Sequence, residues 1–321
     1  MSPDSLCDVA PAPVPVAGVV PFSSVDWPGT LAATLFLQGC PWRCPYCHNP
    51  DLRDAAKCGD VGAAAHDLEW RGVLDLLGER RGLLDAVVFT GGEPTMHRGL
   101  GTAIDAVHDM GFAVGLHTSG CYPEALGRIV REHCPEWIGL DVKSDPRDAQ
   151  AYARVAYGGG DFGGGEHGGG EAGRGFAPAQ LVAGAKVLRS LEIVAGAMMG
   201  AAPGATAGAE PVPDGAGARR PALEVRTTVW PDSPAVAGVP GIADVLAGVA
   251  TEPGAELATE FEGKAAFTWA IQKARPDGVS PDAEAAAGFR ADRPGWADEF
   301  DELVAGARER LRGTSVAVIG R

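Results

Sequence analysis

Apolar and polar positions alternate in blocks along the chain, and the apolar blocks predict six strands. Each block is short, mainly apolar and bounded by turn residues, which is typical of a strand buried within a sheet. The six predicted strands lie at residues 35–39 with their flanks, 84–94, 112–120, 137–143, 223–230 and 266–272.

Helical spacing of apolar residues fills the stretches between these strands. Leu68, Val73, Leu74 and Leu77 recur at helical intervals within residues 67–84. Further helices are predicted at residues 98–110, 123–133, 179–191 and 240–250. Strands that alternate with helices favour an α/β fold with a mainly parallel sheet, in which the active site lies at the carboxyl ends of the strands.

Several segments do not follow this pattern. Residues 158–175 are mostly glycine, and residues 195–220 are rich in alanine, glycine and proline. Neither can bury enough apolar area to offset the entropy of ordering, so both are predicted to be flexible insertions. We also predict a disordered segment at 1–17 and a C-terminal tail at 277–321 with a surface helix at 295–313.

Composition narrows the classes of partner and compartment. The formal net charge of −15 argues against a nucleic-acid partner. The N-terminal stretch lacks a basic start followed by an apolar run, and no uninterrupted apolar segment is long enough for a membrane span. A cytoplasmic protein is therefore expected, in which clustered thiols are more often metal-binding or catalytic than disulfide-bonded.

Three of the seven cysteines form a close group directly after the first predicted strand, in the spacing Cys40-x3-Cys44-x2-Cys47. A structural zinc site usually has four ligands, and His48 could serve as the fourth only with strain because it adjoins Cys47. Three thiolates on a [4Fe–4S] cluster would instead leave one iron open for a substrate or cofactor. The spacing favours a catalytic cluster and leaves zinc as the alternative.

The cysteine motif, with Tyr46 before its last cysteine, resembles that of the radical S-adenosylmethionine (radical SAM) superfamily. More narrowly, VDWPGTLAATLFLQGCPWRCPYCHNPDL, LLDAVVFTGGEPT, MGFAVGLHTSGCYPEAL and IGLDVK resemble the anaerobic ribonucleoside-triphosphate reductase activating proteins, a kind of glycyl-radical-enzyme activase. The resemblance covers roughly residues 18–276 apart from the two insertions. It implies a radical SAM core folded as a partial (β/α)6 barrel.

By this resemblance, Cys40, Cys44 and Cys47 would bind three irons of a single [4Fe–4S] cluster. The amino and carboxylate groups of S-adenosylmethionine would chelate the fourth iron, and Tyr46 would lie beside the adenine. His48 is expected to pack or form a hydrogen bond near the cluster without being a ligand.

The motif Gly91-Gly92-Glu93-Pro94 matches the family segment that holds the amino group of the methionine moiety. Two glycines allow close approach of the backbone, and Glu93 offers a negative charge. The alternative is an ordinary turn with a carboxylate at a helix N-terminus.

Asp141 and Lys143 resemble the Asp-x-Lys of the activases and share one face of a strand. Lys143 could pair with the methionine carboxylate, and Asp141 could position it or face the reacting carbon; a surface ion pair is the alternative.

Weaker cofactor-binding candidates come from three strands. His117 and Ser119 depart from the Asp-Thr-Asn-Gly of related activases, which puts any cation site built on that aspartate in doubt. Arg226, Val229 and Gln272 are further candidates, with Arg226 in a plain ion pair as the alternative.

The implied activity is reductive cleavage of S-adenosylmethionine to a 5′-deoxyadenosyl radical, with a flavodoxin or ferredoxin-type protein as electron donor. The radical would abstract hydrogen from a glycine of a glycyl-radical enzyme, such as anaerobic ribonucleotide reductase. A radical enzyme acting on a small molecule or peptide is the first alternative, and a non-enzymatic zinc-binding module is the second.

Overall fold

A sheet of eight strands organises residues 14–54, 70–158, 176–198, 221–250, 267–276, 279 and 292–321, which the computed structural model describes. The strands are β1 (Val16–Ser23), β2 (Ala32–Leu37), β3 (Ala86–Gly91), β4 (Ala113–Thr118), β5 (Trp137–Asp141), β6 (Ala222–Val229), β7 (Phe267–Lys273) and β8 (Val316–Gly320). Their order in the sheet follows the chain. β1 pairs antiparallel with β2, and all later neighbours pair in parallel.

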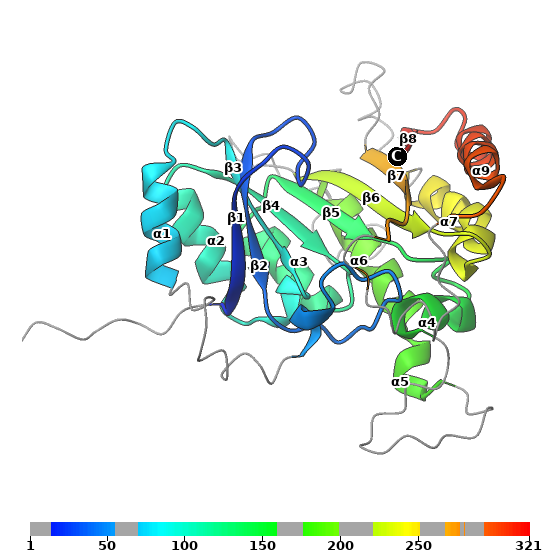
Figure 1. The fold of residues 1–321 in the computed structure, drawn as a ribbon, viewed down its shortest axis with the longest axis horizontal. Helices are drawn as coiled ribbons and strands as arrows, with labels where there is room; N and C mark the ends of the chain where they lie inside the picture. The colour runs from blue at the N-terminus through cyan, green and yellow to red at the C-terminus, as the bar shows by residue number, and fades with distance from the viewer. Residues whose placement is uncertain are drawn as a thin grey trace, which may run out of the picture.

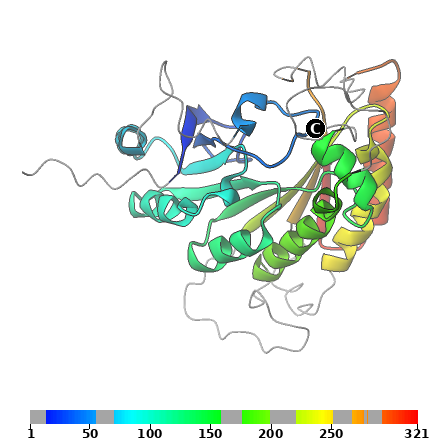
Figure 2. The same ribbon diagram turned by 90° about the horizontal axis from the view of Figure 1, so that it is seen from below.

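Helices connect the parallel strands and gather along one side of the curved sheet (Figures 1 and 2). They are α1 (Trp70–Glu79), α2 (Leu100–Asp109), α3 (Pro123–Glu132), α4 (Ala149–Tyr157), α5 (Pro178–Leu181), α6 (Ala183–Met198), α7 (Pro234–Ala250) and α9 (Trp296–Arg310). Two short 3-10 helices, η1 (Pro50–Arg53) and η3 (Pro94–Met96), follow β2 and β3. The predicted partial α/β barrel is confirmed, with β2 to β7 as its six parallel strands.

The two faces of the sheet are packed differently. Leu35, Leu37 and Phe89 are fully buried in the main core with the helices. On the other face, small residues such as Ala32 and Ala86 form a separate cluster against Trp27. This inner face therefore stays open enough to hold a cavity.

All six predicted strands are present, but two further strands flank them. β1 contains Pro21 and Gly18, which obscure a strand pattern and are tolerated at a sheet edge. Because β1 begins at Val16, and Val14 is buried, the prediction of disorder over residues 1–17 is wrong at its C-terminal end. Residues 1–13 lie outside the described part of the chain.

The C-terminal segment is more than a tail with a surface helix. The predicted helix is present as α9, but it buries Trp296, Phe300 and Val304. β8 then pairs in parallel with β7 and was not predicted. The short apolar run VAVIG carries too little pattern to distinguish a strand from a loop.

Helix boundaries also differ from the predictions at three places. α4 was not predicted, although Asp148 caps it by accepting from the backbone N–H groups of Gln150 and Ala151. α7 continues through Pro240, which the sequence suggested as a start. α6 extends to Met198, so the second insertion does not begin at residue 195, while residues 159–175 and 199–220 lie outside the described residues.

The burial of α9 gives a test of the C-terminal unit. Phe300→Ala should lower the free energy of unfolding by about 3–5 kcal/mol, because it removes a buried aromatic ring next to β8. Urea unfolding measures this, with the exposed Glu302→Ala as the control. Equal, small effects of both changes would contradict the packing of α9 and β8 on the sheet.

Candidate active site

A cavity of about 890 Å³ opens at the carboxyl ends of the parallel strands and extends along the inner face. It brings together most of the residues predicted from the sequence. The predicted residues that line it are Cys40, Cys44, Tyr46, Cys47, Gly91, Gly92, His117, Ser119, Asp141, Lys143, Arg226 and Gln272. Glu93, Pro94 and Val229 do not line the cavity, whereas Thr228 beside Val229 does.

The cysteine loop is held at its base by hydrogen bonds to η1. The side-chain amide of Gln38 donates to the backbone oxygens of Asp51 and Asp54 at 3.0 and 2.9 Å. The backbone N–H of Gly39 donates to Leu52 O, and that of Cys40 donates to Arg53 O. The chain after the third cysteine therefore folds back on the end of β2, which fixes the loop at the cavity.

The partly buried thiols of Cys40 and Cys44 are held in the protonated form. Burial raises the pKa of Cys44 to about 11, although the nearby Lys143 opposes the rise. Burial, followed by the charges of Cys44 and Glu93, raises the pKa of Cys40 well above its ordinary value. Metal ligation would have to displace these protons, so a bound cation would compete with them at neutral pH.

The arrangement of ligand side chains bears on the kind of metal centre. Among the described residues, no three His, Cys, Asp or Glu side chains are grouped so that they could hold one metal ion. A cluster does not need such convergence, because each thiolate can bind a separate iron. The donor set of Cys40, Cys44 and Cys47 therefore fits an iron–sulfur cluster better than a mononuclear zinc site.

The two glycines of the Gly-Gly-Glu-Pro turn pack against the base of the cysteine loop. Gly92 N–H donates to Leu37 O at 2.8 Å, and Glu93 N–H donates to Gly39 O at 2.7 Å. A Cβ on Gly92 would overlap the carbonyl of Gly39, and Gly91 has a φ of +107°, which side-chain-bearing residues rarely adopt. Glycine is thus required here by the neighbouring strand end.

The carboxylate of Glu93, which was predicted to bind the cofactor, is held within the protein by hydrogen bonds. This carboxylate is fully buried and accepts hydrogen bonds from the hydroxyls of Thr95, Thr118 and Ser119 and the backbone N–H groups of Thr95 and Ser119. Both oxygens are therefore occupied, and Pro94 is buried as the first residue of η3. Glu93 joins the ends of β3 and β4 and, as observed, does not contact the cavity.

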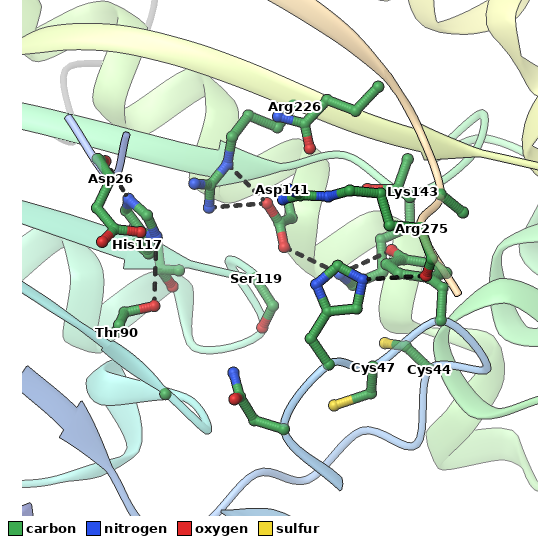
Figure 3. A pocket seen from close by; sticks show the side chains of 18 of the residues that line it. Asp26, Cys44, Cys47, Thr90, His117, Ser119, Asp141, Lys143, Arg226 and Arg275 are labelled. Atoms are coloured by element: carbon green, nitrogen blue, oxygen red, sulfur yellow. Dashed lines mark hydrogen bonds and ion pairs between the residues drawn. The ribbon is translucent and has the colours of Figure 1, made fainter. Parts of the chain in front are cut away.

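His117 is tied into the wall of the cavity (Figure 3). Its Nε2 lies 2.7 Å from the backbone oxygen of Asp26, and its Nδ1 lies 3.2 Å from the hydroxyl of Thr90. A carbonyl can only accept, so Nε2 carries the hydrogen and Thr90 donates to Nδ1. Burial, assisted by Arg226, lowers the pKa of His117 to about 3 and keeps the ring neutral.

The loop between β1 and β2 packs against the inner face of the sheet. Its residues were not predicted from the sequence as part of the site. Trp27 stacks on Trp137 with ring centroids 5.7 Å apart, and Gly115 leaves room for the Trp27 ring. The Asp26 carboxylate accepts from the hydroxyls of Ser23 and Thr34. These contacts make the loop part of the cavity wall, and only the tertiary fold reveals them.

Asp141 lies between two cations. Its carboxylate contacts Lys143 Nζ at 3.1 Å and the guanidinium of Arg226 at 2.9–3.0 Å (Figure 3). Burial alone would raise the pKa of Asp141, but the two cations outweigh it and lower the pKa to about 2. Burial alone would lower the pKa of Lys143, and the Asp141 carboxylate reverses this and raises it well above the ordinary value.

Lys143 also connects this ion group to the cysteine loop. Its Nζ donates to the hydroxyl of Tyr46 at 3.1 Å and lies 5.4 Å from the ring centroid of Trp42. The Tyr46 ring in turn lies 5.4 Å from that of Trp230. Trp42 was not predicted as a site residue, because a tryptophan between two cysteines gives no signal of its position.

A second hydrogen bond joins the end of the cysteine loop to the chain that follows β7. His48 Nε2–H donates to the backbone oxygen of Arg275, just after β7, at 3.3 Å. This agrees with the expected hydrogen-bonding role of His48 near the three cysteines.

Residues 34–162, which include the cysteine loop and all strand ends from β2 to β5, match the family model described as Radical SAM superfamily. The chain contains a radical SAM domain. No helix among the described residues is long and apolar enough to cross a bilayer.

Three curated proteins that resemble parts of this chain have different named activities. A Methanocaldococcus jannaschii protein, provisionally named a glycyl-radical enzyme activating enzyme, is 31% identical over 130 residues, 40% of this chain and 50% of the relative. The benzylsuccinate synthase activating enzyme of Thauera aromatica is 59% identical over 34 residues, 11% of this chain and 10% of the relative. The S-adenosylmethionine-dependent nucleotide dehydratase of Selenomonas ruminantium is 32% identical over 88 residues, 26% and 27% of the two chains. These matches span half or less of each relative's length.

The packing of the radical SAM motif predicts the effect of a single methyl group. Gly92→Ala should lower the free energy of unfolding by about 1–3 kcal/mol and reduce iron uptake, because the Cβ must displace the backbone of Gly39. Unfolding and iron content after reconstitution are the measurements. The control is Gly306→Ala in α9, where the space is open and a gain of about 0.5–1 kcal/mol is expected. Wild-type behaviour of Gly92→Ala would contradict the contact.

The neutral His117 predicts a pH dependence of stability. The pKa of His117 in the folded protein is about 3, below the value of about 6.5 in an unfolded chain. The unfolded state therefore binds the proton first, and stability should fall as the pH drops from about 6.5 toward 3. His117→Gln should reduce this slope in urea unfolding between about pH 6.5 and 4. An unchanged slope would refute the assignment of a neutral ring.

Proposed function

We propose that this radical SAM enzyme abstracts a hydrogen atom from a glycine of a partner protein and so installs a glycyl radical. The observation that carries the proposal is the single cavity that holds Cys40, Cys44 and Cys47 together with Asp141, Lys143 and Arg226 in a radical SAM domain. A [4Fe–4S] cluster with bound S-adenosylmethionine would supply the electron transfer and bond cleavage that yield a 5′-deoxyadenosyl radical.

In this proposal the three thiols each bind one iron. Cys40 and Cys44 are partly buried and would lose their protons on ligation, while the hydrogen bonds from Gln38 and Gly39 keep the loop in place.

The side of the cavity that carries Lys143, Asp141 and Arg226 would hold the methionine moiety. Lys143 and Arg226 together carry more positive charge than Asp141 neutralises, which suits a carboxylate. The amino group would then lie near the backbone of Gly91 and Gly92 and near Ser119. The Glu93 carboxylate is not available to it, because that carboxylate is already saturated with hydrogen bonds. Tyr46 would contact the adenine with its ring, since its hydroxyl is bonded to Lys143.

Two of the three relatives described above support a protein substrate, because they are named as activating enzymes. Anaerobic ribonucleotide reductase is our first candidate partner, and a flavodoxin or ferredoxin-type protein is the proposed electron donor. Hydrogen abstraction from a small molecule is the second candidate function, because one relative is named a nucleotide dehydratase. A zinc-binding module is disfavoured by the lack of convergent ligands in the described residues.

The cleavage reaction can be tested without knowledge of the substrate. The protein is purified without oxygen, reconstituted with iron and sulfide, reduced, and assayed for 5′-deoxyadenosine formed from S-adenosylmethionine. Cys44→Ala should lose iron and at least about 100-fold of the product, because it removes a cluster ligand. Cys134→Ala, a thiol on the outer surface, is the control.

The outcomes separate the candidate functions. A colourless protein that binds zinc and forms no product would refute radical chemistry. If 5′-deoxyadenosine forms, a glycyl-radical signal by electron paramagnetic resonance on added anaerobic ribonucleotide reductase supports the partner. Product formation without that signal, together with turnover of a nucleotide, would favour the small-molecule alternative.

A further inference from the structure

The charged side chains of Lys143, Arg226 and Asp141 lie beside the cavity and together carry a net positive charge. The side chains of Lys143 and Arg226 are 5% and 13% exposed, and both pair with the one carboxylate of Asp141, which is 32% exposed. Sequestering a charge from water is costly unless an opposite charge compensates it. The group therefore keeps an excess positive charge next to the cavity.

This charge lies on the side of the cavity formed by the cysteine loop. Lys143 Nζ donates to the Tyr46 hydroxyl at 3.1 Å and lies 5.4 and 5.3 Å from the ring centroids of Trp42 and Tyr46. Both aromatic residues belong to the segment from Cys40 to Cys47. Figure 3 shows Lys143 and Asp141 on the side of the pocket where Cys44 and Cys47 lie.

The carboxylate of Glu93, which is fully buried near the loop, is stabilised differently from that of Asp141. Glu93 accepts hydrogen bonds from hydroxyl and backbone N–H groups, and no salt bridge to it is found among the described residues. It therefore does not neutralise Lys143 by contact. The cysteine loop thus has a cation against its Cys44 side, and this cation is paired with Asp141.

We propose that Lys143 sets the reduction potential of the metal cluster held by Cys40, Cys44 and Cys47, and that Asp141 opposes it. The inference rests on the proposed function, since it requires the cluster. Reduction adds one electron from an external donor to the cluster, with no bond made or broken, and a nearby cation stabilises the added negative charge. Lys143 acts here through its charge, in addition to any contact with S-adenosylmethionine.

The signs of the effects test the proposal. Reconstituted protein without S-adenosylmethionine is titrated with dithionite, and the reduced cluster is followed by electron paramagnetic resonance. Lys143→Met should make reduction at least tenfold less favourable, a midpoint lower by about 59 mV for one electron. Asp141→Asn should shift the midpoint upward, and Lys143→Arg should stay close to wild type. Arg189→Met, which removes an exposed cation on α6, is the matched control and should not shift it.

Opposite shifts for Lys143→Met and Asp141→Asn support the proposal, because a general loss of structure would not reverse sign between the two. Unchanged midpoints, or shifts of the same sign, overturn it without refuting the proposed function, which cluster assembly and S-adenosylmethionine cleavage by the wild-type protein test. If Lys143→Met does not assemble a cluster, Arg226→Gln replaces it, with a downward shift expected and no shift refuting the proposal. A wild-type protein that binds no iron–sulfur cluster would refute both this inference and the proposed function.

Discussion

The close backbone contact between the ends of β2 and β3 is the constraint on which the site depends. Gly92 and Glu93 donate to the carbonyls of Leu37 and Gly39, directly before the first cysteine of the motif. No side chain fits at Gly92. Because Glu93 continues from this contact to Thr118 and Ser119, one interaction aligns the ends of three parallel strands with the cysteine loop.

Two carboxylates near the cavity, the buried Glu93 and the partly exposed Asp141, are stabilised in two different ways. Glu93 is stabilised by hydrogen bonds from uncharged donors and is closed to the cavity. Asp141 is stabilised by Lys143 and Arg226 and lines the cavity. The first arrangement fixes the backbone, whereas the second leaves unbalanced positive charge where anionic ligands would bind. Structural and chemical roles are thus divided between the two acids.

The edges of the sheet complete the wall of the cavity. The loop after β1 contains Asp26 and Trp27 and packs against the inner face of the sheet. His117 holds this loop through a hydrogen bond to the backbone oxygen of Asp26. At the other edge β8 brings Arg321 to the cavity, where it pairs with the buried Glu224. Both edges of the sheet therefore contribute residues to the lining of the cavity, including Asp26 and Arg321.

The sequence by itself determined the six parallel strands, the helices between most of them and the three clustered thiols. These features depend on local patterns of apolar residues and on short motif spacing, which are visible without long-range contacts. It also predicted that Asp141 and Lys143 lie at the cavity, because Asp141 ends the strand β5 and Lys143 comes two residues later. Only the tertiary structure decided that Glu93 faces Thr118 and Ser119, that His117 holds the loop at Asp26, and that β8 joins the sheet. Such contacts join residues far apart in the chain. The direction in which each side chain points depends on tertiary packing, which no local sequence pattern encodes.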